Sequence, residues 1–251
     1  MSDNKAVYYD ATGLTGTNIT LTPTNLNALI KANEGALAND KNVIIGDVCA
    51  KLELTDKNPF NAPVAFTATS AKFTKTVEND YATMVIPFAA AVPSDVEAYE
   101  ITGNNGDKLT TSLVESVAAN KPVMLKGNGT FDFVAENAAI AATTNAAQNN
   151  GLLNGVYANT AVPTENTYVL QKQVEDVNFY KAISGLTVNP FRAYLTTAVA
   201  GAARLTFDFN EATGIKTVKT TEGTEVYNLQ GVRVANPTKG LYIVNGKKVI
   251  K

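Results

Sequence analysis

Short runs in which apolar and polar residues alternate recur along most of this chain, separated by groups of Gly, Pro, Asn and Asp. Such alternation is typical of a β-strand with one buried face, and the separating residues favour turns. The regular spacing predicts an all-β protein, an antiparallel β-sandwich of the Ig-like or Greek-key type. The runs predicted as strands are Ile19–Thr22, Val43–Ile45, Ala71–Thr76, Tyr81–Ile86, Glu97–Ile101, Lys108–Leu113, Pro122–Lys126, Thr130–Val134, Leu152–Tyr157, Tyr168–Gln173, Val177–Lys181, Arg192–Leu195 and Arg204–Phe209.

Two segments fit either a helix or a strand. Leu26, Leu29 and Ile30 fit one face of a short helix, but an extended Ala28–Lys31 competes with it, and the β context favours the strand. The alanines of Ala135–Asn150 favour a helix. The asparagines and the lack of an apolar stripe in this segment weaken that interpretation.

Two turns between predicted strands are specific enough to test. Glu175–Asp176 is predicted to turn the hairpin between Tyr168–Gln173 and Val177–Lys181. The Asn104–Asp107 turn offers oxygens that could hold calcium, but it lacks the alternating acids of a dedicated calcium loop. Hairpin-turn chemistry is therefore the favoured explanation of its composition.

The turn-rich stretches also predict the boundaries of the domains. Pro59 and Pro63 follow the segment that ends at residue 58, and Ala212–Ile215 is a linker of small residues. We expect an N-terminal β-rich segment over residues 1–58, the main β-sandwich over 59–213, and a small C-terminal β-meander over 214–251.

The C-terminal stretch carries the strongest turn signals of the chain. Asn245-Gly246 is the strongest short-range signal for a β-hairpin. Gln230-Gly231 and Asn236–Gly240 predict two further turns. An open edge of this meander could pair with a strand from a partner, whereas the closing lysines would discourage that.

The residues of the tail match a known pattern at Val226–Gly231, Lys239–Val244 and Lys247–Lys251. In these residues the tail resembles the C-terminal sorting domain of the type IX secretion pathway, although it is shorter than those domains. It is similar, too, to the tails of many surface proteins of anaerobic gut bacteria. The resemblance implies an extracellular or outer-surface location, with the tail either an operating signal or a structural end-cap.

Residues 59–88 and 168–209 resemble a β-rich module that recurs in secreted proteins of gut bacteria. This resemblance implies no activity that can be assigned to a residue. The chain departs from the module at Tyr81–Thr83, where such modules often carry tryptophan. The matching stretches are Asn58–Phe60, Phe66–Ala68, Met84–Phe88, Tyr168–Leu170, Phe179–Ala182 and Ala193–Leu195.

Composition narrows the function further. Of the 251 residues, 45% are hydrophobic and 18% are charged, which is typical of a globular chain. A net charge of −2 argues against a nucleic-acid surface, and no apolar run is long enough to predict a transmembrane segment. No apolar h-region follows Met1–Lys5, so no signal peptide is predicted, and a secreted protein with this sequence is expected to be a mature or shortened chain.

The absence of histidine removes the common catalytic arrangements. With no His and a single cysteine, Cys49, the chain cannot build a Ser-His-Asp or Cys-His site, or a thiolate zinc site. Cys49 is expected to be a small buried hydrophobe. Since no phosphate-binding loop occurs either, no cofactor or metal is predicted.

Carboxylates and tyrosines are the remaining candidates for chemistry. Glycoside cleavage needs two acids that face one cleft, and the candidate acids are scattered among turns and strand faces. Sugar binding uses exposed aromatic rings, but aromatic residues in alternating strands are usually part of a core. The candidate acids are Asp47, Glu53, Asp56 and Asp80, and the candidate tyrosines are Tyr157, Tyr168, Tyr180, Tyr194 and Tyr242.

Taken together, these patterns favour a non-catalytic, secreted or cell-surface β-sandwich module with a structural or adhesive role. A carbohydrate-binding module is the first alternative and predicts exposed, coplanar tyrosines beside Asn or Asp. A carboxylate-dependent glycoside hydrolase is the second and predicts two acids in one pocket. The expected partner is a glycan or another surface protein.

Overall fold

The computed structural model divides the chain into two compact units, Met1–Phe209 and Asn210–Lys251. It describes residues 8–13, 27–33, 40–143, 147–198, 201–207, 209, 226–228, 234, 241–244 and 247–250. Every regular element within these ranges is a β-strand, so the all-β prediction is confirmed. Ile19–Thr22 lies outside the described residues.

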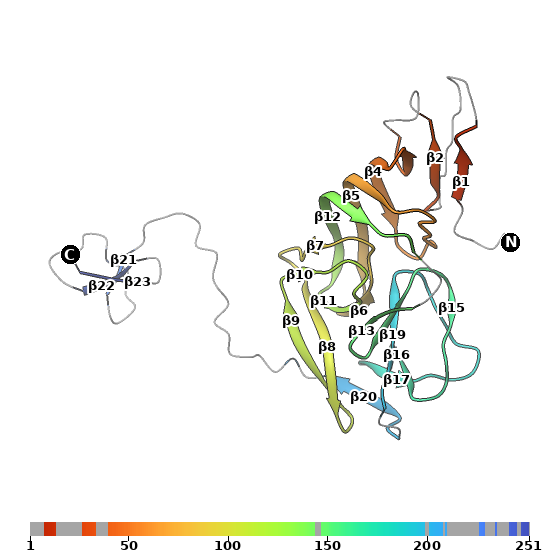
Figure 1. The fold of residues 1–251 in the computed structure, drawn as a ribbon. Helices are drawn as coiled ribbons and strands as arrows, with labels where there is room; N and C mark the ends of the chain where they lie inside the picture. Colours follow the sequence, from red (N-terminus) through yellow and green to blue (C-terminus); the bar gives the residue numbers. More distant parts are fainter. Residues whose placement is uncertain are drawn as a thin grey trace. The chain divides into compact units, whose positions relative to one another are not determined.

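The first large sheet of the N-terminal unit is mixed in direction (Figure 1). Its order is β1-β2-β3-β4-β5-β12, in which β1/β2, β2/β3 and β4/β5 are parallel pairs. Because β4 and β5 pair along their lengths, the elements on either side of residue 58 share one sheet. The strands are β1 (Tyr8–Ala11), β2 (Leu29–Ala32), β3 (Val43–Ile45), β4 (Val48–Thr55), β5 (Phe66–Val77) and β12 (Gly129–Ile140).

The second large sheet has ten strands and is strongly curled, like half of a barrel (Figure 1). Its order is β13-β14-β19-β16-β17-β20-β9-β8-β11-β6, and β20 runs parallel to β9. Its strands are β6 (Tyr81–Met84), β8 (Glu97–Asn105), β9 (Lys108–Val114), β11 (Val123–Lys126), β13 (Gln148–Asn150), β14 (Leu153–Val156), β16 (Thr167–Gln173), β17 (Asp176–Lys181), β19 (Arg192–Thr196) and β20 (Arg204–Phe207). The described residues of this unit also form two short pairs, β7 (Ala90–Ala91) with β10 (Ser116–Val117), and β15 (Thr160–Ala161) with β18 (Thr187–Val188).

The parallel pairs correct the expectation that the sheets are purely antiparallel. Alternation of apolar and polar residues shows that one face of a strand is buried, and this pattern is the same for a half-buried strand of either direction. The direction of a neighbour depends on the path of the chain between the two strands. That path includes long connections which local patterning does not determine.

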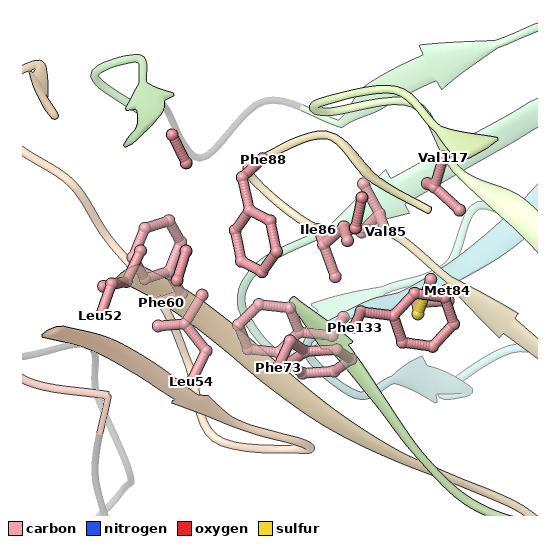
Figure 2. Packing of buried hydrophobic residues seen from close by; sticks show 14 of the residues in the cluster. Leu52, Leu54, Phe60, Phe73, Met84, Val85, Ile86, Phe88, Val117 and Phe133 are labelled. Atoms are coloured by element: carbon pink, nitrogen blue, oxygen red, sulfur yellow. The ribbon is translucent and has the colours of Figure 1, made fainter. Parts of the chain in front are cut away.

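One hydrophobic core joins the two large sheets (Figure 2). Phe73 of β5 and Phe133 of β12 are fully buried against Met84 of β6 and the residues that follow it, including Ile86 and Phe88. Burying one such side chain contributes about 1.5–3 kcal/mol, so this core is a main source of stability. A separate cluster, which includes Tyr168, Phe179 and Leu195, belongs to the curled sheet alone.

Both segments with an open helix or strand assignment form strands. Leu29–Ala32 is β2, whose Leu29 and Ile30 are buried. Within Ala135–Asn150, β12 continues to Ile140 and Gln148–Asn150 forms β13. Pairing of β12 with β5 buries Ala138 and Ile140, and this tertiary burial outweighs the helix propensity of alanine.

The hairpin turn between β16 and β17 lies one residue before its predicted position. Gln173 pairs with Asp176, so the turn is Val174–Glu175 and not Glu175–Asp176. Val174 has φ of 56° and is 92% exposed. A β-branched residue rarely takes this backbone conformation, so the sequence points away from the true turn.

The C-terminal unit contains a three-stranded antiparallel sheet. Its strands are β21 (Val226–Tyr227), β22 (Leu241–Val244) and β23 (Lys247–Ile250), in that order. Val244 pairs with Lys247, which confirms a hairpin around Asn245-Gly246. The predicted turns at Gln230-Gly231 and Asn236–Gly240 fall on positions outside the described residues.

Candidate functional site

A polar hollow of about 190 Å³ opens on the N-terminal unit where β6, β16, β17 and β19 meet the end of β5. Its volume is below the roughly 300–1,000 Å³ of pockets that hold drug-sized ligands. It therefore suits a small group or one residue of a longer ligand. Its polar lining includes Glu78, Asn79, Tyr81, Gln171, Lys172 and Arg192.

The turn between β5 and β6 places Tyr81 in this hollow. Asn79 and Asp80 have φ of 55° and 67°, a backbone conformation that Asn and Asp tolerate better than most residues. The ring of Tyr81 lies 5.6 Å from that of Phe209 at an angle of 12°, and 5.0 Å from that of Phe207. These contacts hold the half-buried Tyr81 ring in a fixed orientation.

Three charged side chains form a largely buried group that reaches the hollow through Arg192. Arg192 Nη1 and Nη2 donate to Asp56 Oδ1 and Oδ2 at 2.6 and 2.9 Å. Lys75 Nζ lies 3.7 Å from Asp56 Oδ1 and has no hydrogen-bond partner. The side chains of Lys75, Asp56 and Arg192 are 0%, 14% and 19% exposed. One carboxylate thus faces two cations.

The residue before Arg192 fixes the start of β19. Phe191 is fully buried and has φ of 60°, which is unusual for a bulky side chain. Its ring packs on Phe73 at 4.7 Å and edge-on against Tyr157 at 5.5 Å, and its N–H donates to Val156 O at 2.7 Å. These contacts hold the backbone in this conformation and so direct Arg192 towards Asp56.

None of the four acids considered from the sequence lines the hollow, where Glu78 is the only carboxylate among the described residues. Asp56 binds Arg192, and Glu53 pairs with Lys41 at 2.8 Å. Asp47 and Asp80 are exposed in turns. The hollow therefore does not present the pair of carboxylates that glycoside cleavage needs.

Of the tyrosines considered from the sequence, the four whose side chains the structure describes do not form an exposed aromatic surface. Tyr157, Tyr168 and Tyr194 are 5%, 0% and 9% exposed, so they belong to the core. Burial raises the pKa of Tyr157 well above its ordinary value, and its hydroxyl donates to Asn120 Oδ1 at 2.7 Å. Tyr180 is half-buried, and the side chain of Tyr242 is outside the described part.

Sequence reasoning about ligand binding missed Tyr81 and Arg192. Two features of the sequence could have indicated Tyr81. It stands where the similar modules often carry tryptophan, and it directly follows an Asn-Asp turn. Arg192 gave no comparable signal, because its partner Asp56 lies far away in the sequence.

The surroundings of Cys49 and of the Asn104–Asp107 turn are those expected for a role in the fold. Cys49 is fully buried, and burial raises the pKa of its thiol from 9.0 to about 11. Gly106 has φ of 63° and its carbonyl accepts a bond from Asn104 Nδ2 at 3.1 Å, as hairpin-turn chemistry predicts. Within the described ranges, no three His, Cys, Asp or Glu side chains come close enough together to hold a metal ion.

Comparisons of the chain with protein-family models, curated proteins and solved structures give no match. In the parts of the chain for which the structure gives elements, no helix could cross a membrane. Any function of the hollow must therefore be inferred from the residues that line it and from their geometry.

Proposed function

We propose that this chain is a non-catalytic module of the cell surface or the extracellular space, with a structural or adhesive role. The observation that carries the proposal is the way in which the two large sheets are joined. They share one core, and the ion pair of Asp56 and Arg192 connects the turn after β4 to the start of β19. Such cross-linking supports a rigid scaffold that presents a surface.

For the N-terminal unit we propose an Ig-like or Greek-key β-sandwich as the finer type of fold. It is supported by the shared core, to which β4, β5 and β12 of one large sheet and β6 of the other contribute buried residues. The parallel pairs make it an irregular member of that class.

The proposed location is supported by the resemblance of the tail to type IX sorting domains and by its three-stranded sheet. The test compares the full chain with a chain that ends at Phe209, each preceded by a signal peptide, in a bacterium that has this pathway. An operating signal predicts that only the full chain reaches the outer surface. Equal export of both chains would identify the tail as an end-cap.

A carbohydrate-binding module is the second candidate, and one observation favours it. The half-buried ring of Tyr81 lies beside the exposed amide of Asn79 in a hollow with room for a single sugar. Aromatic rings beside polar groups are a common way to hold small polar ligands. Binding to a glycan array that is lost in Tyr81→Ala would support this candidate, and no binding to any glycan would leave the structural role.

A further inference from the structure

We propose that the hollow binds a sugar that carries a carboxylate, with Arg192 as the residue that contacts the anion. This inference rests on the carbohydrate-binding candidate above and names its substrate class. The charged group that Arg192 connects to the hollow contains two cations and one carboxylate.

With all three side chains ionised, the buried group has one positive charge in excess. Lys75 and Arg192 share the single carboxylate of Asp56, and the Nζ of Lys75 has no hydrogen bond although the residue is fully buried. A buried charge is costly unless it is paired and hydrogen-bonded. Glu78 and Lys172, the other charged residues of the hollow, are exposed and oppositely charged, so they leave the excess in place. An anion bound in the hollow would reduce this excess of positive charge.

Arg192 is oriented to receive that anion. A guanidinium group carries five N–H donors, and two of them are directed at Asp56. This bidentate pair fixes the plane of the group, while Arg192 also lines the hollow. Its remaining donors match the planar oxygens of a second carboxylate. Asp56 acts here as a positioning residue.

The other lining residues favour a sugar over a simple carboxylic acid. Tyr81 offers a ring held by Phe207 and Phe209, and Asn79 and Gln171 offer amides that can bond hydroxyl groups. The volume of about 190 Å³ suits one sugar residue, so the ligand would be a terminal or protruding acidic sugar of a glycan.

The test measures binding of the full chain to an oligomer of glucuronic acid and to the matched neutral oligomer of glucose, by isothermal titration calorimetry. We expect the acidic oligomer to bind about tenfold more tightly or better, and this preference to fall with rising salt. Arg192→Lys keeps the charge but loses the planar fork, and should abolish the preference.

A second variant keeps the test decisive if Arg192→Lys does not fold. Gln171→Glu adds a carboxylate to the hollow and should weaken acidic binding about tenfold or more while neutral binding persists. The control is Val134→Glu, which adds the same charge at an exposed position of β12, a strand that does not line the hollow. It should change neither the binding of the acidic oligomer nor that of the neutral one.

The outcomes separate this inference from the function on which it rests. Equal binding of acidic and neutral oligomers would overturn the role of Arg192 and leave a carbohydrate-binding module. A matched sulfated oligomer of glucose is titrated in the same way, and a preference for it over the carboxylated oligomer would overturn the choice of anion. Binding of neither class would overturn both statements.

Discussion

Replacing Asp56 with asparagine removes the only carboxylate in the buried charged group and changes little else in size. In the folded protein, the variant Asp56→Asn leaves Lys75 and Arg192 without their shared counter-charge. Both cations are well hydrated in the unfolded chain. The substitution should therefore destabilise the folded state.

The magnitude follows from the burial of the two cations. Removing one partner of a buried ion pair costs about 3–5 kcal/mol. Arg192 is 19% exposed and can turn partly towards solvent, whereas Lys75 is fully buried and cannot. We expect a loss of about 3 kcal/mol, which for a unit of this size lowers Tm by roughly 6–12 °C.

Urea unfolding followed by far-ultraviolet circular dichroism measures the effect. The matched control is Asp132→Asn, which breaks the pair with Lys72 at 2.7 Å, whose side chains are 45% and 47% exposed. Bonds from Lys72 and Thr74 hold the pKa of Asp132 below its usual value, yet such an exposed pair contributes less than about 1 kcal/mol. If both variants lost the same small amount, the account of a buried, unbalanced group would be wrong.

The other predictions concern three separate sites. Cys49 should not react with a thiol reagent at pH 8 until urea unfolds the chain, because burial raises its pKa to about 11. Val174→Gly should raise stability by about 1 kcal/mol in urea titrations, since φ of 56° is strained for valine. Gly155→Ala should cost about 1–3 kcal/mol, because a Cβ there would lie 2.7 Å from the side chain of Val85; Gly103→Ala, with nothing within 4 Å, is its control in the same measurement.

Local patterning determines much of this fold and little of its site. The alternation in Ala71–Thr76 places Phe73 and Lys75 on one face of the strand, and the structure buries both. The same rule found most strands of the curled sheet. The alternation rule therefore indicates that Lys75 points into the core, but it does not indicate which residue neutralises that lysine.

The partners of Lys75 come from distant parts of the chain. Asp56 follows β4, and Arg192 begins β19 after the unusual backbone of Phe191. No periodicity relates these positions, because their contact depends on how the two large sheets pack. The hollow beside them has the same origin, so single-sequence reasoning could find its residues only one at a time.

The excess charge connects the stability of the protein to its proposed ligand. Lys75→Met should leave a balanced, largely buried Asp56–Arg192 pair and remove a buried amine that has no hydrogen bond, so we expect it to be neutral or stabilising. A ligand that binds the folded state raises stability in proportion to RT ln(1 + [L]/Kd). If an acidic sugar partly neutralises the group, then Lys75→Met should show a smaller rise in Tm with oligoglucuronate than the unsubstituted chain at the same concentration. An equal rise in both proteins would mean that Lys75 and the hollow are electrostatically independent, and the buried lysine would then destabilise the fold without contributing to ligand binding.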